Sequence, residues 1–288
     1  MAKAPQVRGL YHQPTSTFSY VAWDPDTRRA AIIDAVLDYD GAAGRTGTET
    51  AAALLAIVAA ERLEVEWILE THAHADHLSA ANYLHQRTGA PVGTGAGVTA
   101  VQSMFSEIYN LGADFATDGR QFDRLFADGE TFGLGGLEVE VLATPGHTSD
   151  SVTFLVGDAA FVGDTLFSPD YGSARCDFPG GDAATLFRSV QRLYRLPTAT
   201  RLFLCHDYPP EGREPRCEWS VAEQREGNIH IGADTRLEDF VAMRESRDKT
   251  LSMPALIIPS IQVNIRAGRL PDPDDNGTRY LRVPLDTL

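Results

Sequence analysis

Alternating and clustered apolar positions predict a chain of mixed strands and helices. Leu137, Val139 and Val141 alternate with Glu138 and Glu140, the period-two pattern of a strand with one buried face. Short continuous apolar runs predict further strands, and longer runs with helical spacing predict helices. The predicted strands are 18–23, 30–37, 65–69, 137–143, 152–156, 159–162 and 201–205. The predicted helices are 49–63 (with Thr48 as its cap), 78–87, 98–111, 183–196 and 238–247.

The order of these elements predicts two sheets flanked by helices, because runs of strands come before helices in each half of the chain. Residues 41–48 and 209–215 are predicted loops, and the tail 271–284, rich in Pro, Asp and Gly, is predicted to cover the surface. With 288 residues, 43% of them hydrophobic, the chain has enough material for a sizeable core. Periodicity alone does not determine the topology.

The charge balance limits the partners that the chain can bind. It has 40 acidic and 25 basic residues, a formal net charge of −15, which argues against nucleic acids and anionic membranes as partners. An anionic substrate would therefore need local arginines. The apolar stretch 51–60 is far shorter than the roughly 20 residues of a membrane span. Three cysteines, and no apolar signal segment in residues 1–20, favour a reducing, cytoplasmic location.

Three histidines and one aspartate fall within six residues, directly after the predicted strand 65–69. They are His72, His74, Asp76 and His77. In an extended chain, residues two apart point the same way, so we expect His72 and His74 to share a face. Asp76 and His77 are then expected to begin a helix and turn back toward the same point. Imidazole and carboxylate groups together suit zinc or iron, so this cluster predicts a metal site.

Three more residues of metal-ligand type follow predicted strands in the same manner. His147 follows the alternating strand 137–143, Asp164 follows 159–162, and His206 follows 201–205. Each is weak evidence alone, because an aspartate after a strand is usually a turn residue. Together with the first cluster they indicate one metal centre at the ends of several strands. His12, His85 and His230 have no such context and are interpreted as ordinary residues.

This order of His, Asp and His residues resembles the metallo-β-lactamase superfamily over residues 15–210. Within that superfamily the chain is most similar to the persulfide dioxygenases, also called sulfur dioxygenases. The segments that carry this similarity are 71–77, 163–167, 175–178 and 205–208, and segment 259–268 resembles the bacterial branch. The resemblance implies an α/β fold, an αββα sandwich of two mixed sheets flanked by helices. We expect one domain over residues 1–288, with 210–288 as a C-terminal extension packed on it.

The resemblance also implies a reaction and a cofactor. In that family one Fe(II) is bound by residues that correspond to His72, His147 and Asp164, and the substrate is glutathione persulfide. Oxygen and water convert it to sulfite and glutathione. His74, Asp76, His77 and His206 would then hydrogen-bond behind the ligands or bind a second metal.

Two further positions match family contacts to glutathione. Arg175 corresponds to a residue that pairs with a glutathione carboxylate, and Tyr208 to another glutathione contact. The alternatives are a surface ion pair of Arg175 with Asp177, and a half-buried loop position for Tyr208. Segment 168–174 departs from the human-type pattern of the family, which puts the shape of the thiol pocket in doubt. The family resemblance also suggests a homodimer.

Two other functions remain open from the residues alone. All ligand types for a binuclear zinc site are present, which favours a thioester hydrolase of the glyoxalase II type as the alternative. Against it, the region after His206 does not resemble the helical glutathione-binding domain of that family. A redox-responsive module using Cys176 and Cys217 is the last alternative. Cys205 is expected to be a core residue.

Overall fold

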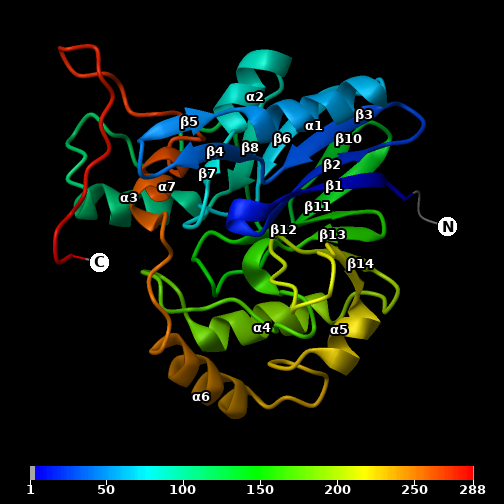
Figure 1. Ribbon diagram of the computed structural model, residues 1–288. Coiled ribbons are helices and arrows are strands. Elements are labelled where there is room, and N and C mark those ends of the chain that lie inside the picture. The colour runs from blue at the N-terminus through cyan, green and yellow to red at the C-terminus, as the bar shows by residue number, and fades with distance from the viewer. Residues whose placement is uncertain (1–3, 288) are drawn as a thin grey trace.

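In the computed structural model, which describes residues 4–287, two six-stranded sheets pack face to face between two layers of helices (Figure 1). The first sheet has the strand order β1-β2-β3-β6-β8-β9. Its pairs β1/β2 and β2/β3 are antiparallel, and the rest are parallel. Its strands are β1 Gln6–His12, β2 Thr17–Trp23, β3 Arg29–Ile33, β6 Glu64–Glu70, β8 Val92–Gly95 and β9 Arg124–Phe126.

The second sheet has the order β10-β11-β12-β13-β14-β15, with one parallel pair, β13/β14. Its strands are β10 Thr131–Leu134, β11 Leu137–Ala143, β12 Val152–Val156, β13 Ala159–Phe161, β14 Arg201–Phe203 and β15 Glu218–Ser220. A small third sheet contains β4 Val36–Asp40, β5 Arg45–Gly47 and β7 Leu78–Ser79. The prediction of two mixed sheets flanked by helices is confirmed.

Seven α-helices lie outside the two large sheets (Figure 1). Helices α1 and α2 cover the first sheet, and α4, α5 and α6 lie on the side of the second sheet. Their bounds are α1 Glu49–Ala60, α2 Ala81–Thr88, α3 Val98–Ile108, α4 Ala183–Leu193, α5 Val221–Gly227, α6 Leu237–Asp248 and α7 Ile257–Asn264. None of the helices within residues 4–287 combines the length and apolarity required to span a membrane.

The apolar pattern explains the layers. In β11, Val139 and Val141 are fully buried between the sheets, whereas Leu142 packs toward α4 and Glu138 faces solvent. Burying one strand face against the opposite sheet and the other under helices removes apolar surface from water on both sides. The alternation in the sequence therefore placed β11 correctly.

Several predicted boundaries are wrong, each for a physical reason. The predicted strand 30–37 is two strands, because Asp34 adopts a left-handed backbone (φ 51°) between β3 and β4. Thr48 makes no side-chain cap on α1; Asp38, from β4, instead accepts hydrogen bonds from the amide and hydroxyl of Thr50. The predicted helix 78–87 begins only at Ala81, after the short strand β7. Strands β1, β5, β8, β9, β10 and β15 and helices α5 and α7 were not predicted, and β5 lies within segment 41–48, which was predicted to be a loop.

Residues after β14 complete the second sheet and then run to the first half of the molecule. Strand β15 pairs with β14, α6 packs on α4, and α7 contacts β7 near α3 (Figure 1). The tail after Leu270 is largely exposed, as predicted. This path brings α7 next to the histidine cluster, although at least 180 residues separate them in sequence.

Candidate metal centre

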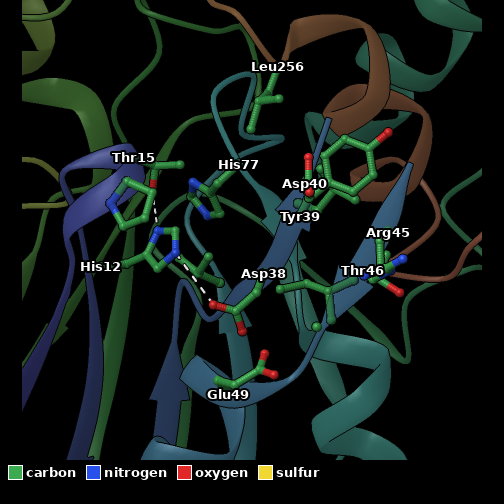
Figure 2. Close-up of a pocket in the computed structure, with 15 residues that line it drawn as sticks. His12, Thr15, Asp38, Tyr39, Asp40, Arg45, Thr46, Glu49, His77 and Leu256 are labelled. Carbon is green, nitrogen blue, oxygen red and sulfur yellow. Dashed lines mark hydrogen bonds and ion pairs between the residues drawn. The ribbon is translucent and has the colours of Figure 1, made fainter. Parts of the chain in front are cut away.

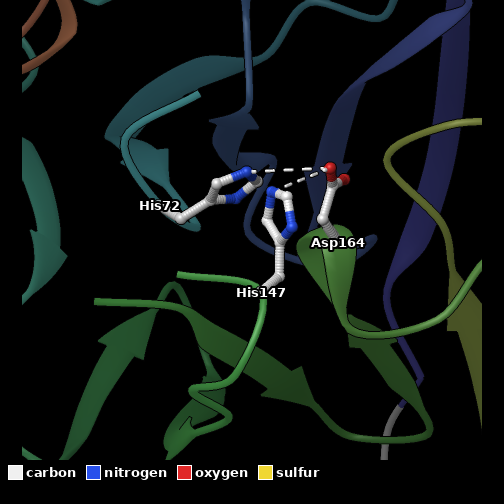
Figure 3. Close-up of side chains that lie close together, drawn as sticks. All are labelled: His72, His147 and Asp164. Atoms are coloured by element: carbon white, nitrogen blue, oxygen red, sulfur yellow. Dashed lines mark ion pairs between the residues drawn. The ribbon is translucent and has the colours of Figure 1, made fainter. Parts of the chain in front are cut away.

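His72, His147 and Asp164 converge from three separate segments at one end of the sheets (Figure 3). His72 lies in the loop after β6, His147 between β11 and β12, and Asp164 in a short turn after β13. Nε2 of His72 lies 3.9 Å from Oδ2 of Asp164, and Nε2 of His147 lies 3.5 Å from the same oxygen. One potential ligand atom from each residue lies within 4.8 Å of the other two. All three side chains are buried.

The remaining predicted residues form an adjoining group. His74, Asp76 and His77 also offer ligand atoms within 4.8 Å of one another. Nε2 of His206 lies 3.3 Å from Asp76 and 3.5 Å from Asp164, so Asp164 lies between the two groups. Every histidine and carboxylate that the sequence proposed for the metal site is therefore in this region of the structure.

Asp76 and His77 do not begin a helix, contrary to the sequence-based expectation. Residues 71–77 form an irregular loop, and α2 starts four residues after His77. The rings of His72 and His74 lie side by side with their centroids 4.0 Å apart. The loop itself, rather than a helix start, turns His77 back toward His206.

In His72, His147 and His206, a hydrogen bond at Nδ1 determines that Nε2 is the bare nitrogen, meaning the one with a free lone pair. Nδ1 of His147 donates to the carbonyl of Arg175 at 2.7 Å, and Nδ1 of His206 donates to the carbonyl of Ser16 at 3.2 Å. A carbonyl oxygen only accepts, so in the neutral ring Nε2 carries the lone pair. Nδ1 of His72 lies 3.0 Å from the hydroxyl of Thr71. That hydroxyl donates to Asp34, which leaves its oxygen free to accept from His72.

The bare atoms fit a bound cation. Buried polar atoms normally have partners, because an unpaired one loses its hydration without compensation. Among the described residues, five atoms of this cluster are buried with no hydrogen-bond partner: His72 Nε2, His74 Nδ1, His77 Nε2, His206 Nε2 and Asp164 Oδ1. Lone pairs from imidazole and carboxylate aimed at one region form the donor set that zinc and iron prefer. The residues present therefore fit a metal ion.

Burial keeps two of these rings neutral. Burial, assisted by the neighbouring His74, lowers the pKa of His77 to about 4. Burial, followed by the charges of His74 and His147, holds the pKa of His72 well below its usual value. A neutral imidazole has the lone pair that a metal requires. Both rings are thus prepared to bind a metal at neutral pH.

His74 has an environment that sequence reasoning missed. Its Nε2 lies 3.1 Å from Asp34 and 3.4 Å from Glu70, and all three side chains are buried. Burial lowers the pKa of His74, but the two carboxylates, Asp34 above all, more than offset it and raise that pKa well above its usual value. Asp34 also accepts a hydrogen bond from the amide of Thr71 at 2.8 Å, so it orients the start of the loop as well.

Two glycines, each directly before a candidate ligand, allow the backbone conformations that position His147 and Asp164. Gly146 has φ 139°, and a Cβ atom there would lie 2.3 Å from the backbone of Leu186 in α4. Gly163 has φ 52°, and a Cβ atom there would lie 2.6 Å from the hydroxyl of Thr71. Only glycine allows both the backbone angle and the close approach. The loop carrying His147 therefore rests on α4, and the turn carrying Asp164 rests on the loop of His72.

Asn264, in α7, holds the loop of the first histidine group. Its side-chain amide donates to the carbonyls of His74 (2.7 Å) and His77 (2.8 Å), and its oxygen accepts from the amide of Ser79 (2.8 Å). Segment 259–268, which contains Asn264, resembles the bacterial branch of the family, but its sequence pattern predicts no role for Asn264. Asn264 is about 190 residues from the histidine loop in the sequence, so no pattern among its neighbouring residues predicts this contact.

We expect Asn264→Ala to weaken metal binding about 10–100-fold, because groups that orient ligands contribute that much to metal affinity. The change removes all three hydrogen bonds to the loop. Competition with a chelator measures the metal dissociation constant. Gln262→Ala is the matched control: Gln262 is equally buried in α7 but bonds to Ile258 and Arg282 instead. Equal metal affinity in the two variants would contradict the role of Asn264.

A pocket of about 400 Å³ opens above His147 and Asp164, within the size range of small-molecule sites. Phe167, Tyr171 and Tyr208 form an aromatic wall of this pocket, and the ring centroids of the two tyrosines are 4.6 Å apart. Arg175, Arg244 and Arg247 also line it and give it positive charge. We call this space the arginine pocket. Tyr208 lines it, as its predicted contact with glutathione requires.

Arg175 lines the arginine pocket but is already paired. Its Nε and Nη2 donate to the two oxygens of Asp177 at 2.6 and 2.7 Å, and Nη1 donates to the carbonyl of Ser252 at 2.6 Å. This is the ion pair that the sequence analysis held open as the alternative. Its contact with glutathione stays a prediction.

A second pocket, of about 560 Å³, is lined by His77 (Figure 2). Asp38, Asp40 and Glu49 line it against one arginine, Arg45, so it is acidic. Pro14, Thr15 and Leu256 line both pockets and therefore separate them. Because like charges repel, an anionic substrate is favoured in the arginine pocket and disfavoured here.

His12, which the sequence offered no reason to single out, begins a chain of polar contacts that ends at His206. Nε2 of His12 lies 3.5 Å from Asp38, and its Nδ1 lies 2.7 Å from the hydroxyl of Thr15 (Figure 2). Thr15 contacts the hydroxyl of Thr17 at 2.7 Å, and Thr17 lies 3.4 Å from Nδ1 of His206. These contacts fix the orientation of the His206 ring.

The cysteines do not resemble reactive thiols. Burial raises the pKa of Cys176, and burial raises that of Cys217 to about 11. Cys205 is buried beside His206, as expected for a core residue. The thiolate is the reactive form, so raised pKa values disfavour oxidation or exchange at neutral pH.

Comparison with known proteins gives one family and several named relatives. Residues 12–206 match the family model of the metallo-beta-lactamase superfamily. The chain is 53% identical over its whole length to a beta-lactamase hydrolase-like protein of Agrobacterium fabrum, but spans only 66% of that relative. It is 48% identical to glyoxylase B2 of Dictyostelium discoideum, covering 95% of this chain and 94% of that one.

More distant matches include persulfide dioxygenase. The chain is 30% identical to the mitochondrial persulfide dioxygenase ETHE1 of Homo sapiens, over 70% of this chain and 68% of that one. Among solved structures, ETHE1 from Myxococcus xanthus matches with 32% identity and a TM-score of 0.73, covering 92% of this chain and all of that one. Named oxidoreductases and relatives with hydrolase-type names thus share this fold.

Proposed function

This chain belongs to the metallo-beta-lactamase superfamily, and from that premise we propose that it is a glutathione-dependent persulfide dioxygenase. One Fe(II) would be bound by His72, His147 and Asp164. The observation that carries the proposal is that these two imidazoles and one carboxylate lie together beside the arginine pocket, which His147 and Asp164 line. The relationship to persulfide dioxygenases at 30% identity supports the same assignment.

The proposed reaction converts glutathione persulfide, O2 and water to glutathione, sulfite and two protons. The outer sulfur loses four electrons to one O2 molecule and takes its third oxygen from water. Fe(II) bound by two histidines and one carboxylate leaves coordination positions open for sulfur and oxygen. The protein holds the ligand rings in one orientation, through the bonds of His147 to Arg175 and of His72 to Thr71.

The pocket supplies binding and orientation. Its arginines favour the carboxylates of glutathione in a chain whose net charge of −15 would otherwise repel them. Phe167, Tyr171 and Tyr208 supply apolar surface that limits water around the persulfide. The bound peptide thereby places its terminal sulfur beside the metal ligands.

A binuclear zinc hydrolase of the glyoxalase II type is the second candidate. His74, His77 and His206, together with Asp76, would supply the donor set that a second metal needs. Neighbouring carboxylates raise the pKa of His74 and of His206, so a metal bound there would have to displace a proton from each ring. The 48% identity to glyoxylase B2 supports this candidate as well. Such an enzyme would hydrolyse a glutathione thioester to a carboxylic acid and glutathione.

Metal analysis separates the two functions. We expect about one iron per chain in protein purified from its own host, oxygen uptake with glutathione persulfide, and no hydrolysis of S-lactoylglutathione. His77→Ala sharpens the test, because it leaves the iron content unchanged in a one-metal site and halves the metal content in a two-metal site. If the protein contains two zinc ions per chain and hydrolyses the thioester, the dioxygenase proposal is wrong and the hydrolase is the function. Oxygen uptake by the Cys176→Ser, Cys217→Ser double variant would exclude the redox-module alternative.

A further inference from the structure

The charged side chains that line the arginine pocket differ in how far they are already paired. They are Asp76, Asp164, Arg175, Arg244 and Arg247. The two aspartates belong to the candidate metal centre. The three arginines are the groups that can attract a carboxylate from solution, so the question is which guanidinium is free to bind one.

Two of the three arginines have their donors occupied. Arg175 makes a two-point pair with Asp177 and a third bond to Ser252. Arg244 is 1% exposed; it pairs with Asp248 at 2.6 Å and donates to the carbonyl of Ser173 at 3.1 Å. A substrate carboxylate at either arginine would have to displace an internal partner.

Arg247 is different. It lies in the last turn of α6, is exposed, and lines the arginine pocket. Among residues 4–287, no carboxylate or carbonyl pairs with its guanidinium. Its charge also reaches His230, which contacts Ser173 behind the pocket wall: the pKa of His230 is lowered to about 4 by burial, then by Arg244 and Arg247. Arg247 is thus an unpaired cation at the pocket wall.

The helix that carries Arg247 is fixed against the pocket. Arg244 and Asp248 lie one turn apart on α6; Arg244 bonds to Ser173, and Asp248 accepts the amide of Cys176 at 2.8 Å. Both bonds join α6 to segment 173–176, which contributes Ser173, Ala174 and Arg175 to the pocket wall. The anchored helix fixes the backbone of Arg247 beside the pocket, so that only its side chain has to be ordered when it binds a carboxylate.

We propose that Arg247 is the residue of the C-terminal extension that binds a carboxylate of the glutathionyl group, with Arg175 remaining paired to Asp177. The inference rests on the proposed function in that it takes glutathione as the substrate carrier. It moves the recognition of the peptide from the sheet-end loops to α6. Arg247 is then a specificity-determining residue that acts on binding and takes no part in the chemistry.

The test uses S-methylglutathione, which keeps both carboxylates and cannot react, with binding measured by calorimetry on the full-length metal-bound protein. Arg247→Gln is expected to weaken binding at least tenfold. Lys249→Gln, which removes the same charge two residues away on an exposed side chain outside the pocket, is expected to leave binding unchanged. The dimethyl ester of S-methylglutathione should bind the wild type weakly, and Arg247→Gln should not weaken that binding further.

The outcomes separate the two claims. If the wild type binds S-methylglutathione and Arg247→Gln binds it equally well, the role of Arg247 is wrong while the proposed function stands. If both charge variants weaken binding to the same extent, general electrostatic attraction replaces a specific contact, and the role is again wrong. If the wild type does not bind S-methylglutathione, the glutathione-dependent function itself is overturned. In turnover, we expect Arg247→Gln to raise KM with little change in kcat.

Discussion

His147→Ala is expected to abolish metal binding and turnover together. The ring supplies one of only three donors in the His72, His147 and Asp164 group, and its bare Nε2 lies 3.5 Å from Asp164. Loss of groups that merely orient ligands costs about 10–100-fold in metal affinity, so loss of a ligand is expected to cost more than about 100-fold. Elemental analysis after dialysis, together with oxygen uptake, measures both effects.

His85→Ala is the control for the His147 variant. His85 lies in α2, is partly exposed, and bonds to the carbonyl of Ala90. We expect it to keep both metal and activity. Metal content in His147→Ala equal to that of the wild type would show that His147 is not a ligand, whatever happens to turnover.

Asp248→Ala is expected to destabilise the fold by about 3–5 kcal/mol, since it leaves the guanidinium of Arg244 buried and without its carboxylate. Arg244 and Asp248 are 1% and 4% exposed, and Asp248 also accepts the amide of Cys176. Chemical denaturation followed by circular dichroism measures the free energy of unfolding. Because the pair anchors α6 beside the arginine pocket, weaker binding of glutathione derivatives should accompany the loss.

Two variants provide the comparison for Asp248→Ala. Asp118→Ala breaks a pair with Arg120 that is exposed on both sides, and water screens such pairs so that their loss changes the free energy of unfolding little. Replacing both buried partners, as in Arg244→Met with Asp248→Leu, should recover much of the lost stability, because no unpaired charge is left in the interior. A loss below 1 kcal/mol for Asp248→Ala would show that water reaches Arg244.

The arginine and acidic pockets carry opposite local charges within one strongly acidic protein, so they favour ligands of opposite charge. The net charge alone argues against anionic substrates, yet the wall of the arginine pocket carries three arginines beside the metal centre. The acidic pocket, which His77 lines, carries three carboxylates and one arginine. Local charge rather than total charge therefore decides which pocket an anionic peptide enters.

Local sequence patterns were sufficient to predict the residues of the candidate metal centre and the fold class. His72, His74, Asp76 and His77 lie within six positions, so the cluster is recognisable from a short stretch of sequence. The strand patterns before His147, Asp164 and His206 are likewise recognisable from neighbouring residues alone. Strands such as 18–23 and 137–143 follow from alternation or apolar runs that concern only neighbouring residues. These signals are short-range, so no tertiary information was needed to find them.

Only the tertiary structure decided how these residues are held and what surrounds them. Asp34 interrupts a predicted strand with its left-handed backbone. Its carboxylate hydrogen-bonds to Thr71 and His74, which lie about 40 residues later in the sequence. Asn264 contacts the histidine loop from 190 residues away in the sequence, and Arg247 lines the pocket from helix α6, to which the sequence pattern assigned no functional residue. Contacts between distant segments leave no periodic trace in the chain, because they depend on how whole sheets and helices pack.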